Sequence, residues 1–340
     1  MTASGEIDIR VEGKAGRITL TRPRALNALT YPMANAIETA LLAWRDDPAV
    51  ALIIIDAQGE RAFCAGGDIE DLYRTGTAGD FGFGRKFWSD EYRLNALIAG
   101  YPKPFIAFMQ GFVMGGGVGI SCHGSHRIVC ESTQIAMPEC GIGLVPDVGG
   151  SFLLANAPGR MGEYFGLTGA RMNAGDALCA GFADSFIPLE HWPELKSELA
   201  LSGSVTCIDR FETTAPQSQV AALSDAIDMS FAGKSALECV TALEASGEEW
   251  AVGAARLIRK GCPLSVACAF EIIARVRDMQ TVEQALEQEL CFTWRSMSDG
   301  EFLEGVRAQI IDKDRNPQWR IARLEDVTPE MIAAMLAPVR

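Results

Sequence analysis

Two glycine-rich turns, FCAGGD at residues 63–68 and FVMGGGVG at residues 112–119, follow apolar stretches typical of buried strands. Glycine lacks a Cβ atom, so a ligand can approach the main chain closely, and a turn that leads into a helix leaves N–H groups without helical partners. Two such turns could hold one oxyanion between them. They would suit a reaction in which a thioester carbonyl becomes an enolate or a tetrahedral oxyanion. Glycine turns after strands also occur in many α/β proteins that lack such a site.

Two carboxylates stand in the segment MPECGIGLVPDVGG, residues 137–150, which is otherwise nearly free of charge. Burial raises the pKa of a carboxyl group toward neutrality, and two acids that converge on one pocket can divide the tasks of general base and general acid. Glu139 and Asp147 are therefore candidates for catalysis. The alternative is that either acid is a helix cap or an ordinary turn residue.

Three other patterns in the sequence favour no function. Cys122, His123 and His126 lack a further converging ligand, so we predict no metal site. Ser121 narrowly misses the spacing of a nucleophile elbow, because Gly124 comes one position late. The glycines of residues 63–68 do not form GxGxxG, which argues against a Rossmann oxidoreductase.

The net charge of −14 opposes binding to nucleic acid or to an anionic membrane through the overall field of the protein. We therefore expect no nucleic-acid partner and no membrane partner. A phosphorylated ligand would need a local group of cations. Candidates in the second half of the chain, which are equally well explained as solvated helix faces, are Arg256, Arg259, Lys260, Arg307 and Lys313.

The chain has features of a cytoplasmic protein. No apolar run reaches the roughly 18 uncharged residues of a membrane-spanning helix. Residues 1–16 carry acids early and lack the apolar core of a signal peptide. The ten cysteines stand singly in apolar segments, as expected of small buried hydrophobic residues in a reducing compartment.

The pattern of elements indicates an α/β domain followed by helices. Residues 7–22 read as a hairpin, residues 32–45 as an amphipathic helix and residues 50–57 as a strand covered on both faces. Repeated units of strand, glycine turn and helix fit either a doubly wound sheet or a spiral of sheets. Past residue 173 the periodicity is helical. We place a boundary near residue 205, which gives a core domain over 1–205 and a helical region over 206–340.

Five ordered motifs resemble the enoyl-CoA hydratase/isomerase (crotonase) superfamily over roughly residues 7–190. They are RPRALNAL, FCAGGDI, GFVMGGGVGI, MPECGIGLVPDVGG and LTGARMNAGDALCAGFAD. Within it, the forms PDVGG and VMGGGVG and the late segment EFLEGVRAQIIDKDRNPQW resemble the 3-hydroxyisobutyryl-CoA hydrolases. The resemblance implies a crotonase-like spiral of ββα units followed by a helical C-terminal region.

The resemblance also implies roles for the glycines and the acids. The N–H groups of Gly67 and Gly116 would form the oxyanion hole for the thioester oxygen. Of the two catalytic glutamates of hydratases, only the second is present, as Glu139. The first falls on Gly119, and Asp147 occupies a position where hydratases usually have glycine. This rearrangement favours hydrolysis over hydration.

In the hydrolase, Glu139 would either activate a water or attack the thioester carbonyl to give a mixed anhydride. Asp147 would orient the substrate hydroxyl or assist proton transfer. Glu91 matches a substrate-contacting acid of the group, although a surface helix carboxylate is an equal alternative. The CoA adenine and ribose would run along RPRALNAL and FCAGGDI, where Ala65 and Asp68 are substrate-binding candidates.

A pocket for the acyl group could draw on Phe87, Trp88 and Phe152, with core packing as the alternative. The expected activity is hydrolysis of 3-hydroxyisobutyryl-CoA or a similar short 3-hydroxyacyl-CoA, a step of valine breakdown in the resembling group. Coenzyme A is part of that substrate, and no separate cofactor is expected. Two alternatives remain: an enoyl-CoA hydratase or isomerase, and a non-catalytic acyl-CoA-binding protein. Self-association as a homo-oligomer is also expected.

Overall fold

A computed structural model describes residues 5–339, which form two compact units built from stretches that alternate along the chain. The first unit contains the residues up to 68 together with 93–136 and 172–221. The second unit contains 69–92, 137–171 and the residues from 222 onward. The predicted division into residues 1–205 and 206–340 stays a prediction. The inference about targeting rests in part on residues 1–4, which lie outside the described residues.

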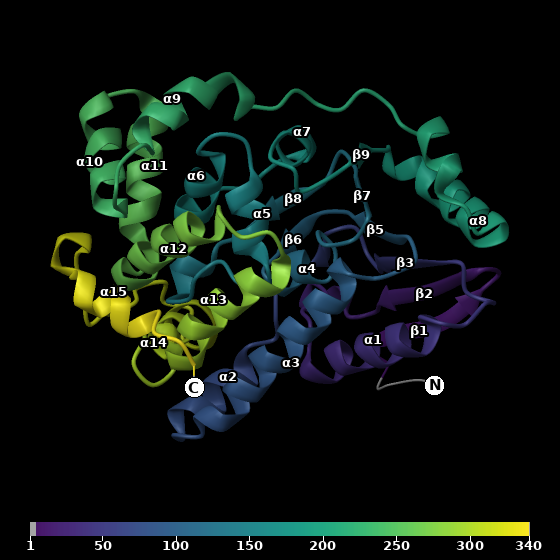
Figure 1. The fold of residues 1–340 in the computed structure, drawn as a ribbon, viewed down its shortest axis with the longest axis horizontal. Coiled ribbons are helices and arrows are strands. Elements are labelled where there is room, and N and C mark those ends of the chain that lie inside the picture. The colour runs from purple at the N-terminus through teal and green to yellow at the C-terminus, as the bar shows by residue number, and fades with distance from the viewer. Residues whose placement is uncertain (1–4, 340) are drawn as a thin grey trace. The chain divides into compact units, whose positions relative to one another are not determined.

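The first unit is built on two sheets (Figure 1). In the larger sheet the order is β1-β2-β3-β5-β7-β9, and in the smaller sheet it is β4-β6-β8. Strands β1 and β2 are antiparallel, and the other pairs are parallel. The strands of the larger sheet are β1 Ile7–Glu12, β2 Ala15–Leu20, β3 Leu52–Ala57, β5 Phe105–Met109, β7 His126–Val129 and β9 Ser185–Phe186. Those of the smaller sheet are β4 Ala62–Cys64, β6 Phe112–Met114 and β8 Gln134–Ala136.

The predicted hairpin is confirmed, with a two-residue turn at Gly13 and Lys14 between β1 and β2. Gly13 has φ +58, a conformation that two-residue hairpin turns need and that glycine adopts without strain. The continuous apolar run of β3 is also explained, because all but the last of its residues are buried. Helix α8 (Trp192–Ser202) packs on one face of this sheet, where the rings of Phe108 and Trp192 meet edge to face.

The glycine turns follow separate short strands rather than the long buried ones. Strand β3 ends at Ala57, and the chain then enters β4 in the smaller sheet before the first turn. Likewise β5 is followed by β6, after a bend at Gly111 with φ +57, where a Cβ would lie 2.3 Å from the carbonyl oxygen of Arg61. Two strands and a helix therefore make the repeating unit. This confirms the crotonase-like spiral of ββα units and excludes the doubly wound sheet.

The helices of the first unit are α1 Tyr31–Trp44, α4 Gly116–Gly119, α7 Ala174–Cys179 and α8, and α3 Phe81–Ala99 continues from the second unit into the first. The second unit is helical, and its residues from 222 onward confirm the predicted helical C-terminal region. Its helices are α2 Glu70–Thr77, α5 Gly150–Asn156, α6 Met161–Thr168, α9 Ser224–Ser230, α10 Ala236–Ser246, α11 Glu249–Lys260, α12 Pro263–Val276, α13 Val282–Ser296, α14 Phe302–Val306 and α15 Pro329–Met335, with the 3-10 turn η2 Glu139–Ile142 and the π-helical turn η6 Arg307–Ile311.

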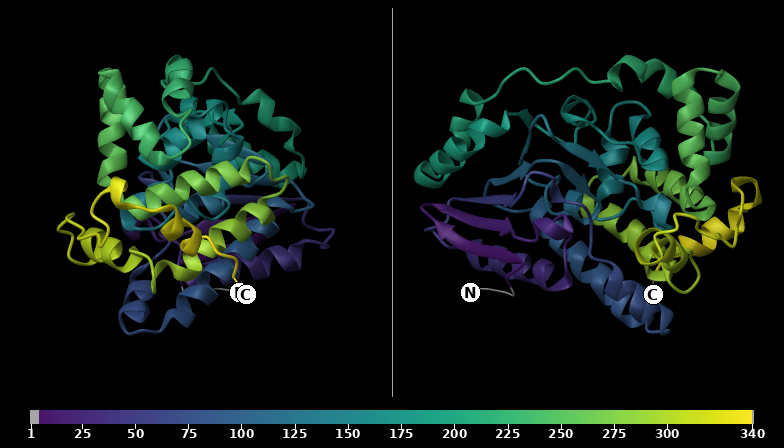
Figure 2. Two further views of the ribbon diagram at one scale, coloured as in Figure 1. Left: turned by 60° about the vertical axis from the view of Figure 1, so that its left-hand side comes forward. Right: turned by 180° about the vertical axis from the view of Figure 1, so that it is seen from behind.

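Helix α12 forms the centre of the second unit, because it is buried on nearly all sides. Pro263 begins this helix, at a position where the missing N–H is not needed. A capping box of Thr281 and Gln284 begins α13. Helices α10 and α11 lie side by side (Figure 2). Among residues 5–339, no helix is both long and apolar enough to cross a membrane. All ten cysteines are free, and all but Cys179 are buried, as predicted.

Candidate active site

The two glycine turns of the first unit lie at the same end of neighbouring strands. Strands β4 and β6 are parallel, and Cys64 pairs with Val113 in their register. Gly67 and Gly116 each come three residues after that pair. Since the carboxyl ends of parallel strands meet at one edge of a sheet, the turns are brought together there. A Cβ on Gly117 would lie 2.3 Å from the Cys64 carbonyl oxygen, so this approach requires glycine.

Backbone hydrogen bonds divide the N–H groups of these turns into occupied and available ones. The N–H of Ala65 donates to the Leu26 carbonyl at 3.1 Å, and that of Asp68 donates to the Leu29 carbonyl at 2.8 Å. Gly116 is the first residue of α4, so its N–H has no helical acceptor. Within the described part of the chain, neither Gly67 nor Gly116 donates its N–H to an acceptor. The two glycines chosen from the sequence are thus available as donors to an oxyanion.

The other predicted substrate contacts of the first unit are partly occupied. The N–H of Ala65 already donates to the Leu26 carbonyl. The carbonyl of Ala65 is therefore the main-chain group that could contact the adenine of coenzyme A. The Asp68 carboxylate pairs with Arg22 at 3.0 Å. Asp68 therefore holds the segment RPRALNAL next to FCAGGDI, and its role as a direct ligand stays a prediction.

The second unit brings together the three acids predicted from the sequence. Glu91 lies on α3, Glu139 begins η2, and Asp147 stands in the turn before α5. All three are at most 5% exposed, and the charge of Asp147 acts on both Glu91 and Glu139. On α3, Trp88, Glu91 and Tyr92 are spaced three and four residues apart, which places them on one buried face. The alternative that Glu91 is a surface carboxylate is therefore wrong.

The acids have raised pKa values, chiefly because burial disfavours their charged forms. Burial and the charge of Asp147 raise the pKa of Glu91 to about 8. Burial raises the pKa of Asp147 to about 7, although a hydrogen bond from Tyr92 opposes the rise. The pKa of Glu139 lies well above its usual range, owing to burial and then to the charges of Asp147 and Glu289. Such a cluster holds protons near neutral pH and can exchange them with a substrate.

Two of these acids have an oxygen without a hydrogen-bond partner. Among the described residues, Oε1 of Glu91 and Oε2 of Glu139 are buried and unpaired. Buried polar atoms are normally paired, so each unpaired oxygen is free to accept a hydrogen bond from a substrate or a water. This supports the choice of Glu139 and Glu91 as groups that contact the substrate.

Tyr92 and Thr293 complete the surroundings of Asp147. The Tyr92 hydroxyl donates to Oδ2 of Asp147 at 2.8 Å and lies 3.3 Å from Oγ1 of Thr293 on α13. Tyr92 is 4% exposed and Thr293 is fully buried. The hydrogen bond from Tyr92 therefore holds the Asp147 carboxylate in one orientation. Sequence reasoning missed Tyr92, although its position beside Glu91 on the buried face of α3 was a usable signal.

Glu289 is a fourth buried acid of the cluster, which sequence reasoning also missed. It lies on α13 and is fully buried, and burial, with the charge of Asp147 as a lesser cause, raises its pKa to about 8. Its position was readable, because the buried face of α13 carries Ala285, Leu286 and Phe292 at helical spacing. Glu289 is thus a charged residue among apolar neighbours on a buried helix face. The same kind of signal singled out Glu139 in its nearly uncharged segment.

The aromatic residues proposed for an acyl pocket behave mainly as core. Phe87 and Trp88 are at most 4% exposed, and Trp88 meets Phe302 edge to face with ring centroids 5.5 Å apart. Phe152, the third residue of α5, is partly exposed. Of the three, Phe152 is the one whose side chain stays accessible.

Two of the cations considered for a phosphate are neutralised by neighbouring acids. Arg259 pairs with Glu244 and Glu325, and Arg307 is surrounded by Glu304, Asp312 and Asp314. Within residues 5–339 no group of three His, Cys, Asp or Glu side chains is arranged to hold a metal ion. The ring of His126 instead lies 2.9 Å from the Ser125 hydroxyl.

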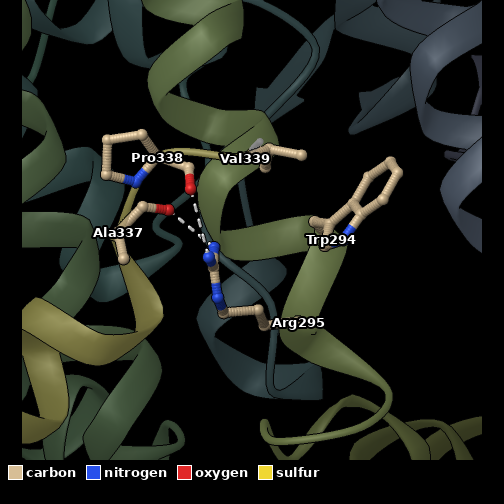
Figure 3. Close-up of a pocket in the computed structure, with 5 residues that line it drawn as sticks. All are labelled: Trp294, Arg295, Ala337, Pro338 and Val339. Atoms are coloured by element: carbon tan, nitrogen blue, oxygen red, sulfur yellow. Dashed lines mark hydrogen bonds between the residues drawn. The ribbon is translucent and has the colours of Figure 1, made fainter.

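A cavity of about 520 Å³ lies beside α13 and the end of the chain (Figure 3). Trp294, Arg295 and residues 337–339 line it, and Arg295 donates to the carbonyls of Ala337 and Pro338. Trp294 and Arg295 come five and six residues after Glu289, so at 100° per residue they face away from its side of the helix. This cavity is therefore separate from the acid cluster.

Known proteins match this chain over nearly its whole length. A sequence profile described as enoyl-CoA hydratase/isomerase matches residues 15–336. The 3-hydroxyisobutyryl-CoA hydrolase 1 of Arabidopsis thaliana is 35% identical over 98% of this chain and 91% of its own. The mitochondrial 3-hydroxyisobutyryl-CoA hydrolase of Gallus gallus is 36% identical over 99% and 90%.

Two solved structures match the fold over almost the whole chain. One, titled an enoyl-CoA hydratase from Rhodobacter sphaeroides, has a TM-score of 0.95 and 50% identity and covers 98% of both chains. The other, titled a carnitinyl-CoA dehydratase from Mycobacterium thermoresistibile, has a TM-score of 0.94 and 38% identity and covers 98% of this chain and 97% of its own.

Proposed function

Because the chain belongs to the enoyl-CoA hydratase/isomerase family, we propose that it is a thioester hydrolase acting on 3-hydroxyisobutyryl-CoA or a similar short 3-hydroxyacyl-CoA. The products are coenzyme A and the free hydroxy acid. The relatives that are 35–36% identical over nearly their whole length carry the name of this activity. In the cell, the reaction would serve the breakdown of valine.

The observation that carries the proposal is the placement of the acids. Glu139 and Asp147 are buried together in the second unit, whereas position 119, where hydratases of the superfamily have their first catalytic glutamate, is a buried glycine of α4. Hydration of a double bond in that superfamily uses the pair of glutamates. Hydrolysis needs one carboxylate that acts as base or nucleophile toward the thioester carbonyl. It also needs a second group that orients the substrate hydroxyl or donates a proton to the leaving thiolate.

In the proposed reaction the N–H groups of Gly67 and Gly116 bind the thioester oxygen and stabilise the negative charge that develops on it. Glu139 in its ionised form takes a proton from a water whose oxygen attacks the carbonyl carbon. Alternatively, Glu139 attacks that carbon itself and forms a mixed anhydride, which water then hydrolyses. In both routes the C–S bond breaks and the thiolate of coenzyme A takes up a proton.

Asp147 and Glu91 have the supporting roles in this proposal. Asp147 orients the substrate hydroxyl or supplies the proton that the leaving thiolate takes up. Glu91 contacts the substrate through its unpaired oxygen. Because burial and neighbouring charges raise the pKa of Glu139 above its usual range, its ionised form increases as pH rises through that raised pKa, and thiol release should increase in the same direction.

A second candidate function is hydration or isomerisation of an enoyl-CoA. The observation that favours it is the 50% identity with a structure titled an enoyl-CoA hydratase. A third is acyl-CoA binding without catalysis, against which the retention of Glu139 and Asp147 argues. The fold alone is compatible with all three.

A substrate panel separates these candidates. Release of free thiol is followed with a disulfide reagent for 3-hydroxyisobutyryl-CoA and other short acyl-CoAs, and loss of enoyl absorbance is followed for a short enoyl-CoA. The proposal expects thiol release, fastest for a 3-hydroxyacyl thioester. Absence of thiol release from every thioester would overturn it, and loss of enoyl absorbance would then establish the second candidate.

The remaining expectations about cofactors, assembly and location are part of the proposal. We expect no cofactor apart from the coenzyme A of the substrate, so chelators should leave the rate unchanged. Self-association is testable by light scattering coupled to gel filtration. The vertebrate relatives are named mitochondrial, and the cytoplasmic location expected from the sequence is testable by cell fractionation.

A further inference from the structure

The turn that follows Asp147 has an unusual backbone. Val148 and Gly149 both have φ in the left-handed region, at +55 and +77. Glycine adopts this conformation freely, but for a β-branched residue such as Val148 it is strained. Strained backbone persists only where the surrounding structure holds it, and it concentrates at functional sites. The question is therefore which group holds this turn.

The carboxylate of Glu289 holds it from α13. Its Oε2 accepts the N–H of Gly149 at 2.8 Å, and its Oε1 accepts the N–H of Ser151 at 3.0 Å and also the Ser151 hydroxyl. Glu289 and Ser151 are both fully buried. One side chain thus satisfies three donors that have no access to water, and these hydrogen bonds favour its ionised form against the burial that raises its pKa to about 8.

The position of Asp147 depends on this anchor. The Gly150 N–H donates to the Asp147 carbonyl at 2.7 Å, which closes the turn on itself. Tyr92 holds only the side chain of Asp147. Without Glu289, the N–H groups of Gly149 and Ser151 would be buried and unpaired, and the turn could relax its strain by moving Asp147.

We propose that Glu289 is a positioning residue for the hydrolysis reaction, which places Asp147 by anchoring the left-handed turn at Val148 and Gly149. The proposal rests on the proposed function. It gives Glu289 no contact with the substrate. It separates the two supports of Asp147, because Tyr92 fixes its side chain and Glu289 fixes its main chain.

Glu289 also acts on the titration of the cluster. The groups that face it are Asp147 in the turn, Tyr92 on α3 and Glu139 in η2, and Glu91 interacts with Asp147 in turn. When Glu289 is ionised, its charge contributes to the raised pKa of Glu139. A glutamine at this position cannot ionise at any pH, so the pKa of Glu139 should fall and the acidic limb of the pH–rate profile should move to lower pH. A residue with a purely structural role would leave the profile in place.

The test compares Glu289→Gln with Glu163→Gln in the full-length protein. Glu163 on α6 is a matched control, because it is equally buried at 1% exposure but pairs with Arg160 and Arg277. Thiol release gives kcat, KM and the pH profile. Hydrogen exchange at residues 147–152, followed by mass spectrometry, reports on the turn without relying on activity.

For Glu289→Gln we expect kcat to fall about 10- to 100-fold with KM within about threefold of wild type, because a misplacement of 1 Å costs rates of this order. We also expect faster exchange at residues 147–152 and an acidic limb at lower pH. Glu163→Gln should change none of these. If Glu289→Gln keeps kcat and the wild-type exchange, or if Glu163→Gln matches its losses, the proposal is wrong.

The test also covers a variant that does not fold and a wild-type protein that shows no activity. If Glu289→Gln does not fold, Ser151→Ala removes one of the three donors, and a several-fold fall in kcat with faster exchange supports the proposal, whereas wild-type values overturn it. If the wild-type protein releases no thiol, the proposed function has failed. In that case exchange at residues 147–152 alone decides whether Glu289 anchors the turn.

Discussion

Replacing Tyr92 by phenylalanine tests how the cluster controls the protonation of Asp147. The substitution keeps the buried ring and removes the hydroxyl that donates to Asp147 at 2.8 Å. A hydrogen bond to a charged group contributes about 1.5–3 kcal/mol. At about 1.4 kcal/mol per pKa unit, its loss should raise the pKa of Asp147, which already lies at about 7, by about 1 to 2.

The assay is a ¹³C NMR titration of protein labelled at the aspartate carboxyl carbons, with the resonance of residue 147 assigned by its loss in Asp147→Asn. Thiol release by Tyr92→Phe should also fall about 10-fold, because the carboxylate is no longer held in one orientation. Tyr101→Phe is the matched control, since the Tyr101 hydroxyl donates to the carbonyl of Leu41 rather than to an acid. A titration midpoint in Tyr92→Phe that coincides with wild type would refute this reasoning.

Two further predictions concern packing and pH. Gly117→Ala places a methyl group 2.3 Å from the Cys64 carbonyl oxygen, so we expect a loss of about 1–3 kcal/mol in urea unfolding and a lower kcat; wild-type stability and rate would contradict this. The pKa of Glu91 is raised from 4.5 to about 8, so its contribution to stability is present below pH 4.5 and is lost as pH rises through about 8. This corresponds to about 5 kcal/mol if the group titrates alone. Unfolding free energies from pH 5 to 8.5 should therefore fall less steeply in Glu91→Gln than in wild type, and parallel curves would exclude this role.

Much of the fold and of the candidate site could be predicted from the sequence, because the signals were local. The two-residue hairpin turn at Gly13, the buried run of β3 and the glycine turns are written in short segments. Glu139 and Asp147 stood out as isolated charges, and the structure places both in one buried cluster. The ordered motifs indicated the superfamily, and the full-length relatives confirm it.

The features that escaped prediction depend on contacts between distant segments. Glu289 acts on Gly149, which lies 140 residues earlier in the chain, so no spacing in the sequence could connect them. The strands β4 and β6 are only three residues long, too short for a periodic signal, and they pair in a second sheet. The pairing of Arg259 with Glu244 and Glu325 is likewise a product of helix packing.

The central claim is that Glu139 drives hydrolysis of a short acyl-CoA thioester. The most direct measurement is thiol release from 3-hydroxyisobutyryl-CoA by wild type and by Glu139→Gln, with coenzyme A binding measured on both by calorimetry. The account predicts thiol release by wild type and a rate at least about 1,000-fold lower in Glu139→Gln, because the substitution removes the nucleophile or base. The affinity for coenzyme A should be retained, since the binding contacts remain. Comparable thiol release by the two proteins, or none by wild type, would contradict it.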